Sequence, residues 1–235
     1  MSDWKYEPAR DQGLAPKERL RSHRRESGLV GATAQGAAWA LNRLYMRLAH
    51  RPRITGIDRL PETQSFIVAA NHCGHLDIMT VCAALPWQLR ERVFPIAAGD
   101  VFFQTPTSTL FSALALNALP MWRRSCGRHG MDELRQRLLD LPTVYVLFPE
   151  GTRSRTGEMA PFKPGVGMLV AGTDVPIVPC RLRGTFEAWP PARRLPRPRK
   201  VSVSFGEPQM YTESSNDKKA WRAIAASLEK AVSEL

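Results

Sequence analysis

Short runs of apolar residues alternate along this chain with longer segments whose apolar positions recur every three or four residues. The short runs predict β-strands, at 53–57, 66–70, 93–97, 143–148, 176–183 and 201–205. The longer segments predict helices, at 76–85, 109–116, 131–140, 165–171 and 215–235. This alternation predicts a single α/β domain with a mostly parallel or mixed central sheet flanked by helices.

The first 52 residues have a different character. Residues 1–26 form a polar arm with several arginines, and a helix is predicted over 29–48. Its apolar positions are compatible with one face, formed by Val30, Trp39, Leu41, Leu44, Tyr45 and Leu48. Such a face could pack on the core, or it could lie in a bilayer interface with Arg43 and Arg47 on anionic headgroups. We expect residues 1–52 to form a basic arm and amphipathic helical segment that faces a membrane.

No segment is expected to cross a membrane. The uncharged segment 27–42 is too short, because a spanning helix needs about 20 predominantly apolar residues. The longer uncharged segment 101–122 contains many polar residues, among them Gln104, Ser112 and Asn117. The N-terminus also lacks the apolar stretch of a signal peptide. We therefore expect a cytoplasmic protein.

Charge and cysteine content narrow the choice of partners. The 235-residue chain carries a formal net charge of +11, which points to an anionic partner: nucleic acid, a membrane surface or a phosphorylated substrate. No RNP-like pattern, zinc finger or recognition helix is present, so we expect no nucleic-acid partner. The 4 cysteines form no CxxC pair, which argues against a zinc site and a disulfide framework.

The turn after the apolar run 66–70 reads NHCGHLD and supplies a histidine and a carboxylate, His72 and Asp77. A carboxylate on one ring nitrogen fixes the tautomer, so the other nitrogen can accept a proton from a substrate. The spacing alone occurs by chance in many chains, and a lone histidine is more often structural. A metal site at His72, His75 and Asp77 is not favoured, because no further ligand cluster is apparent. Cys73 is expected to be a buried, inert thiol.

A second turn follows the strand predicted at 143–148 and reads PEGTRS. Its arginine, Arg153, has planar donors that bind two phosphate oxygens at once. The glycine allows close backbone approach, and neighbouring amides can form an anion-binding concavity. Lys163 adds positive charge nearby. Taken alone, the turn is better interpreted as a solvated one with a structural Glu–Arg pair.

Two shorter patterns complete the set. A short apolar strand ends at Arg123 in the sequence PMWR, and a later strand begins with VPIVP. In order, NHxxxxD, PxxR, FPEGTRS and VPIVP resemble the motifs of the glycerolipid acyltransferases. The nearest branch looks like the bacterial, PlsC-like 1-acylglycerol-3-phosphate acyltransferases. The resemblance extends from about residue 54 to residue 208.

The resemblance implies a role for individual residues. His72 would be the general base and Asp77 its orienting partner, within an acyltransferase domain formed by residues 53–235. The acceptor's phosphate would be bound by Arg123, Glu150, Gly151, Thr152, Arg153 and Lys163. Structural support would come from Asn71, Gly74, Pro176 and Pro179, the two prolines being linked with the acyl-chain side. Gly74 is a departure, because family members often have serine at this position.

The resemblance also implies substrates and location. The donor would be an acyl thioester, acyl-CoA or acyl-ACP, with no bound cofactor and no metal. The acceptor would be a lysophospholipid, with 1-acylglycerol-3-phosphate favoured as the one giving phosphatidic acid. The enzyme would associate peripherally with the anionic inner face of the cell membrane. Alternatives left open are another lysolipid, an ornithine-type lipid or a specialised metabolite hydroxyl, and, less favoured, a non-catalytic module that binds a lipid or an acyl carrier.

Overall fold

A seven-stranded sheet forms the centre of the molecule, with the strand order β1-β7-β6-β2-β5-β3-β4. The computed structural model describes residues 9–26, 28–63, 65–122 and 128–235. All six predicted strands are present, as is the short strand expected before Arg123. The strands are β1 (Arg53–Thr55), β2 (Phe66–Ala70), β3 (Val93–Ala98), β4 (Leu119–Met121), β5 (Val144–Leu147), β6 (Ile177–Arg183) and β7 (Ser202–Phe205).

Neighbouring strands are parallel except for β6 and β7, which pair antiparallel, so the predicted mixed sheet is confirmed. The central strand is β2, whose five residues are all buried, as expected for a parallel strand covered on both faces. Val68 of β2 lies opposite Val146 of β5 and Val178 of β6. The carboxyl ends of these three strands therefore meet at one edge of the sheet, where the chain segments that follow them come together.

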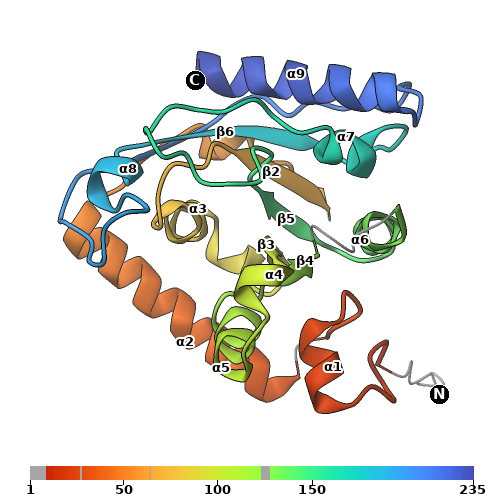
Figure 1. Cartoon of the computed structure of the whole chain (residues 1–235), viewed down its shortest axis with the longest axis horizontal. Helices are drawn as coiled ribbons and strands as arrows, with labels where there is room; N and C mark the ends of the chain where they lie inside the picture. Colours follow the sequence, from red (N-terminus) through yellow and green to blue (C-terminus); the bar gives the residue numbers. More distant parts are fainter. Residues whose placement is uncertain (1–8, 27, 64, 123–127) are drawn as a thin grey trace.

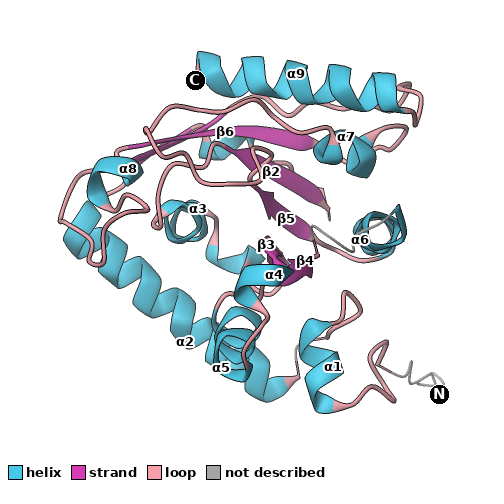
Figure 2. Cartoon of the chain, viewed as in Figure 1, coloured by secondary structure: helices cyan, strands magenta, loops and turns pink. Residues whose placement is uncertain are grey.

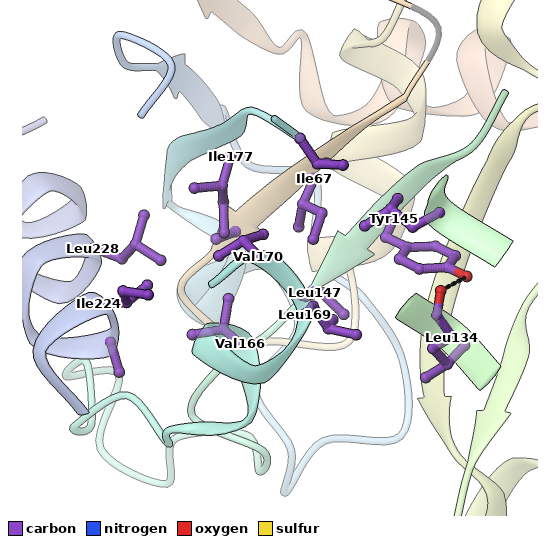
Figure 3. Close-up of a cluster of buried hydrophobic side chains, with 14 of the residues drawn as sticks. Ile67, Leu134, Tyr145, Leu147, Val166, Leu169, Val170, Ile177, Ile224 and Leu228 are labelled. Carbon is purple, nitrogen blue, oxygen red and sulfur yellow. Dashed lines mark hydrogen bonds between the residues drawn. The ribbon is translucent and has the colours of Figure 1, made fainter. Parts of the chain in front are cut away.

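Helices cover both faces of the sheet (Figures 1 and 2). One layer packs on the side of Ile67 and Tyr145, and consists of α6 (Arg128–Asp140), α7 (Gly165–Val170) and α9 (Lys218–Glu234). Figure 3 shows this cluster and the hydrogen bond from the Tyr145 hydroxyl to the Leu134 carbonyl, 3.0 Å long. The opposite face packs against α2 (Leu29–Tyr45) and α3 (Asp77–Ala84) through Val68, Val146 and Trp39.

Several short elements escaped the sequence patterns because they are too brief to show a period. They are α1 (Pro16–Arg21), α4 (Gly99–Phe102), α8 (Thr185–Ala188) and the 3₁₀ turns Ile57–Arg59 and Trp87–Leu89. The helix predicted at 109–116 is α5 (Pro106–Leu110) followed by the π-turn η4 (Phe111–Ala115). Strand β1 is shorter than predicted because Gly56 turns the chain with φ +70°. Within the described ranges, no helix has the length and apolar content needed to cross a membrane.

Helix α2 differs from its predicted single apolar face. It continues into the π-turn η1 (Met46–His50), and its buried side carries Trp39 and Met46. The predicted face also contained Leu41, which is exposed because residues two apart lie on nearly opposite sides of a helix. We call the exposed residues Leu41, Leu44 and Leu48 the leucine row. The helix thus packs on the core by one side and presents apolar side chains on the other.

The described part of the basic arm is docked on the domain. Arg25 is buried and donates hydrogen bonds of 3.0 Å to the Asn117 side chain and to the Ala118 carbonyl. Arg137 of α6 in turn donates to the backbone carbonyls of His23 and Arg25. Burial lowers the pKa of Arg25 to about 10, and the neighbouring Arg137 contributes to this. Arg25, one of the arm's cations, therefore serves an internal contact.

Candidate active site

The histidine and the carboxylate predicted to form a pair do so at the carboxyl end of β2. The Nδ1 atom of His72 lies 2.7 Å from Oδ2 of Asp77. Asp77 is the first residue of α3 and is fully buried, whereas 22% of the His72 side chain is exposed. An ionised carboxylate can accept hydrogen bonds but cannot donate them. The Nδ1 atom facing Asp77 therefore carries the ring proton, and in the neutral ring Nε2 has the lone pair. The arrangement is that of a general base held by an orienting carboxylate.

Asp77 also shapes the turn that carries the histidine. Its Oδ2 atom accepts hydrogen bonds from the backbone N–H groups of Cys73, at 2.7 Å, and Gly74, at 2.9 Å. The same oxygen therefore orients the imidazole and closes the turn. On its other side, the imidazole of His72 stacks on the ring of Phe148, with centroids 4.1 Å apart and planes 18° apart. The ring is thus confined by a carboxylate and an aromatic face.

Glu150 holds the backbone of His72. Its Oε1 atom accepts from the His72 N–H at 2.7 Å, and its Oε2 atom accepts from the Ala160 N–H at 3.0 Å. Glu150 is 2% exposed, and this burial raises the pKa of its carboxyl, which the two backbone hydrogen bonds partly offset. Ser154 donates its backbone N–H to the His72 carbonyl at 2.8 Å. Both oxygens of Glu150 are engaged inside the protein, so its geometry is that of a positioning residue.

Arg153 of the second turn contacts the histidine-bearing turn, and Lys163 contacts the second turn itself. One guanidinium nitrogen of Arg153 contacts the ring of His75, 3.1 Å from its Nε2 atom. Burial lowers the pKa of the His75 imidazole, and Arg153 lowers it further. Lys163 passes over Gly151, where an added Cβ would lie 2.7 Å from the ammonium nitrogen. Gly151 has φ +73°, a conformation that favours glycine.

The remaining residues predicted for the site differ from one another in burial and in hydrogen bonding. Asn71 is buried and ties β2 to β6, accepting from the Leu182 N–H at 2.7 Å and donating to the Leu182 carbonyl at 3.0 Å. Thr152 is exposed in the turn, and Pro176 and Pro179 are buried at and within β6. Arg123 lies outside the described residues. The predicted roles of these residues remain predictions.

The glycine at position 74 is explained by the backbone that covers it. A Cβ on Gly74 would lie 2.5 Å from the carbonyl oxygen of Thr185 and 3.0 Å from that of Trp189. The Trp189 carbonyl also accepts from the His75 N–H at 3.0 Å. Helix α8 and Trp189 therefore seal the histidine-bearing turn, and a serine at position 74 does not fit against them.

Sequence patterns missed the site residues Phe148, Thr185 and Trp189. The only signal for the last two was Gly74 itself, whose missing side chain indicates a close approach. Cys73 agrees with the expectation of an inert thiol. Burial raises its pKa to about 11, and its sulfur donates to the Gly157 carbonyl at 3.4 Å.

Comparisons with known proteins agree with this geometry. A family model described as Acyltransferase matches residues 51–183, which include both members of the His72–Asp77 pair and Arg153. The 1-acyl-sn-glycerol-3-phosphate acyltransferase alpha of Mus musculus is 30% identical over 129 residues, covering 55% of this chain and 44% of that protein. A 1-acyl-sn-glycerol-3-phosphate acyltransferase of Limnanthes douglasii is 43% identical over 142 residues, covering 60% of this chain and 49% of that protein. The chain thus spans about half the length of these curated relatives.

A solved structure shares the fold. The crystal structure of the 1-acyl-sn-glycerophosphate (LPA) acyltransferase PlsC from Thermotoga maritima matches with a TM-score of 0.65 and 22% identity. The match covers 87% of this chain and 80% of that one. The predicted α/β architecture is therefore confirmed by both the sheet and this structural neighbour.

Replacing Gly74 with serine should perturb the active site, because the new side chain would meet the Thr185 and Trp189 carbonyls. Overpacking of this kind typically costs about 1–3 kcal/mol. We expect a lower thermal midpoint and reduced turnover for Gly74→Ser. Gly165→Ser is the control, since a Cβ there meets nothing within 4 Å. Equal midpoints and turnover for the wild-type protein and Gly74→Ser would contradict the assignment of the close approach.

His75 should make stability depend on pH in a defined direction. Its pKa is lowered from 6.5 in the folded protein, so the unfolded chain takes up a proton first as the pH falls through 6.5. The free energy of unfolding should therefore decrease from that pH down to the lower pKa of the folded ring. Urea midpoints at about pH 7.5 and about pH 5.5 should differ more for the wild-type protein than for His75→Asn. Identical differences would show that His75 contributes nothing.

Proposed function

The chain belongs to the Acyltransferase family, and on that premise we propose that it acylates a lysophospholipid. The proposed acceptor is 1-acylglycerol-3-phosphate, the product phosphatidic acid, and the donor an acyl thioester on coenzyme A or acyl carrier protein. The observation that carries the proposal is the His72–Asp77 pair, whose Nε2 atom is free to accept a proton. The curated relatives carry names that specify this acylation.

The geometry supports a direct transfer. His72 Nε2 would take the proton of the acceptor hydroxyl as its oxygen attacks the thioester carbonyl and the C–O bond forms. The tetrahedral intermediate would then collapse, the C–S bond would break, and the imidazolium would return the proton to the departing thiolate. Asp77 would stabilise the imidazolium between these steps. Atoms and protons balance without a covalent enzyme intermediate.

Arg153 and Lys163 support a phosphorylated acceptor. A guanidinium offers paired donors that match phosphate oxygens, and the Arg153 guanidinium contacts the imidazole of His75 in the histidine-bearing turn. Holding the acceptor by its phosphate would bring its hydroxyl to the base, and such orientation can remove several kcal/mol of barrier. Arg123 would join this group on the basis of the sequence resemblance alone.

The leucine row supports peripheral attachment to the inner face of the cell membrane. Leu41, Leu44 and Leu48 are 66%, 55% and 68% exposed, so together they present a large apolar surface to solvent. On the other side of the helix, Met46 belongs to the same buried cluster as Leu76 of the histidine-bearing turn. Docking by α2 would therefore hold the candidate active site beside the layer in which both lipid substrates reside.

Removing the base should abolish most of the activity. We expect His72→Gln to lower kcat by about 100- to 10,000-fold, the usual contribution of a positioned acid–base group. The assay offers the purified protein lysophosphatidate with either acyl-CoA or acyl-ACP. Asp77→Asn should also lower kcat, since the imidazolium would lose its charged partner. Unchanged activity in His72→Gln would refute the mechanism, and circular dichroism checks that both variants fold.

Removing the phosphate-binding arginine should act on acceptor affinity. A hydrogen bond to a charged group contributes about 1.5–3 kcal/mol, so Arg153→Ala should raise KM for lysophosphatidate by about 10- to 100-fold. Acylation of a monoacylglycerol, which has no phosphate, should change little. Arg155→Ala is the control, because that arginine is nearby and exposed. An equal loss with both acceptors would remove the phosphate assignment.

A further inference from the structure

An open depression lies at the carboxyl end of α2, away from the His72–Asp77 pair. It has a volume of about 620 Å³ and is lined by Arg43, Arg47, Arg51, Pro52 and Ala83. Arg43 and Arg47 are four residues apart and lie on one side of the helix and its π-turn, and Arg51 is the residue that follows the π-turn, with φ 45°. Every charged residue in the lining is an arginine, and the remainder is apolar. The depression therefore has the character of a site for an anion with an apolar part.

The arginines have unequal freedom. Arg43 is half-buried, donates to the Leu85 carbonyl and lies 6.0 Å from the centre of the Trp87 ring, so its position is fixed. Arg47 and Arg51 are exposed, and neither has an ion-pair partner within the part of the chain that the structure describes. One arginine thus anchors the depression, and two present unpaired charge.

The position of the depression identifies the kind of anion. Residues 43 and 47 lie on the helix and its π-turn between the buried side, with Trp39 and Met46, and the leucine row, and residue 51 follows directly after the π-turn. On a helix lying in a bilayer interface, apolar side chains enter the acyl layer and flanking arginines lie at the level of the headgroups. The exposed leucines match the acyl chains of a phospholipid, and the neighbouring exposed arginines match its charged headgroup.

We propose that Arg43, Arg47 and Arg51 form a binding site for the phosphate-bearing headgroup of an anionic membrane phospholipid. The inference rests on the membrane attachment in the proposed function and adds a specific lipid contact to it. Arginine forks bind phosphate oxygens in pairs, so the contact would select anionic phospholipid and fix the rotation of α2. Because Met46 joins this helix to Leu76, the bound headgroup would orient the histidine-bearing turn relative to the bilayer.

Vesicle binding tests the site. The double variant Arg47→Ala/Arg51→Ala is compared with the full-length parent on phosphatidylcholine vesicles with and without phosphatidylglycerol. Each basic residue near an anionic surface contributes about 1 kcal/mol, so affinity for the anionic vesicles should fall about tenfold or more. Binding to pure phosphatidylcholine, which depends on the leucine row, should change less than about twofold.

A control matched in charge separates a site from general attraction. Lys218→Ala/Arg222→Ala removes the same charge from α9, on the other side of the molecule from α2 (Figure 1). This variant should keep its affinity for anionic vesicles, and an equal fall in both double variants would overturn the proposal. A normal affinity for anionic vesicles in Arg47→Ala/Arg51→Ala would also overturn it. So would a raised KM for acyl-CoA, because the occupant would then be the phosphates of the donor.

Catalysis is measured separately. With detergent-dispersed substrates, Arg47→Ala/Arg51→Ala should turn over at the parental rate, since neither residue touches the His72–Asp77 pair. Lipid binding is repeated with His72→Gln, whose affinity for anionic vesicles should equal that of the parent. Loss of acyl transfer with normal lipid dependence would therefore count against the proposed function alone, and loss of lipid dependence with normal acyl transfer against the lipid site alone.

Discussion

One buried carboxylate oxygen organises the candidate active site. Oδ2 of Asp77 accepts from the His72 ring and from two consecutive backbone N–H groups, all within 2.9 Å. A buried carboxylate needs hydrogen bonds in place of water, and these three donors supply them to Oδ2, whereas Oδ1 is buried without a partner among the described residues. The turn closes around this oxygen, and the same oxygen orients the imidazole of His72. The local fold of the turn and the orientation of the proposed base therefore depend on the same atom.

The sheet brings the other residues of the candidate active site close to Asp77. Strands β2, β5 and β6 are adjacent, so the segments after them converge, and the backbone of His72 is held between Glu150 and Ser154. Asn71 bonds across to β6 in the same manner. The backbone that carries the imidazole is thus tied to β2, to β6 and to the segment after β5, at the centre of the domain. Arg153 and Lys163, by contrast, come from the turn that follows β5.

The sequence predicted the parts of this arrangement that depend on local pattern. Buried apolar runs located the strands, and parallel pairing implies that the turns at His72 and Arg153 share an edge. The sequence could not predict contacts between distant segments. One example is α8, which covers Gly74 although it lies more than 100 residues later in the chain. Helix α2 shows the same limit. Periodicity revealed its apolar residues, but only the neighbouring strands and α3 decide that Trp39 is covered and Leu41 is not.

The double-sided character of α2 has a consequence for distance. Met46 shares a buried cluster with Leu76 of the candidate active-site turn, and the leucine row lies on the outer surface, so a single helix separates the turn from the leucine row. A helix with its side chains is about 10–12 Å across. In a docked enzyme, α2 would therefore act as a spacer that sets how far the base stands above the acyl layer. An acceptor would need to rise from the bilayer by only about that width, with its acyl chain still largely embedded.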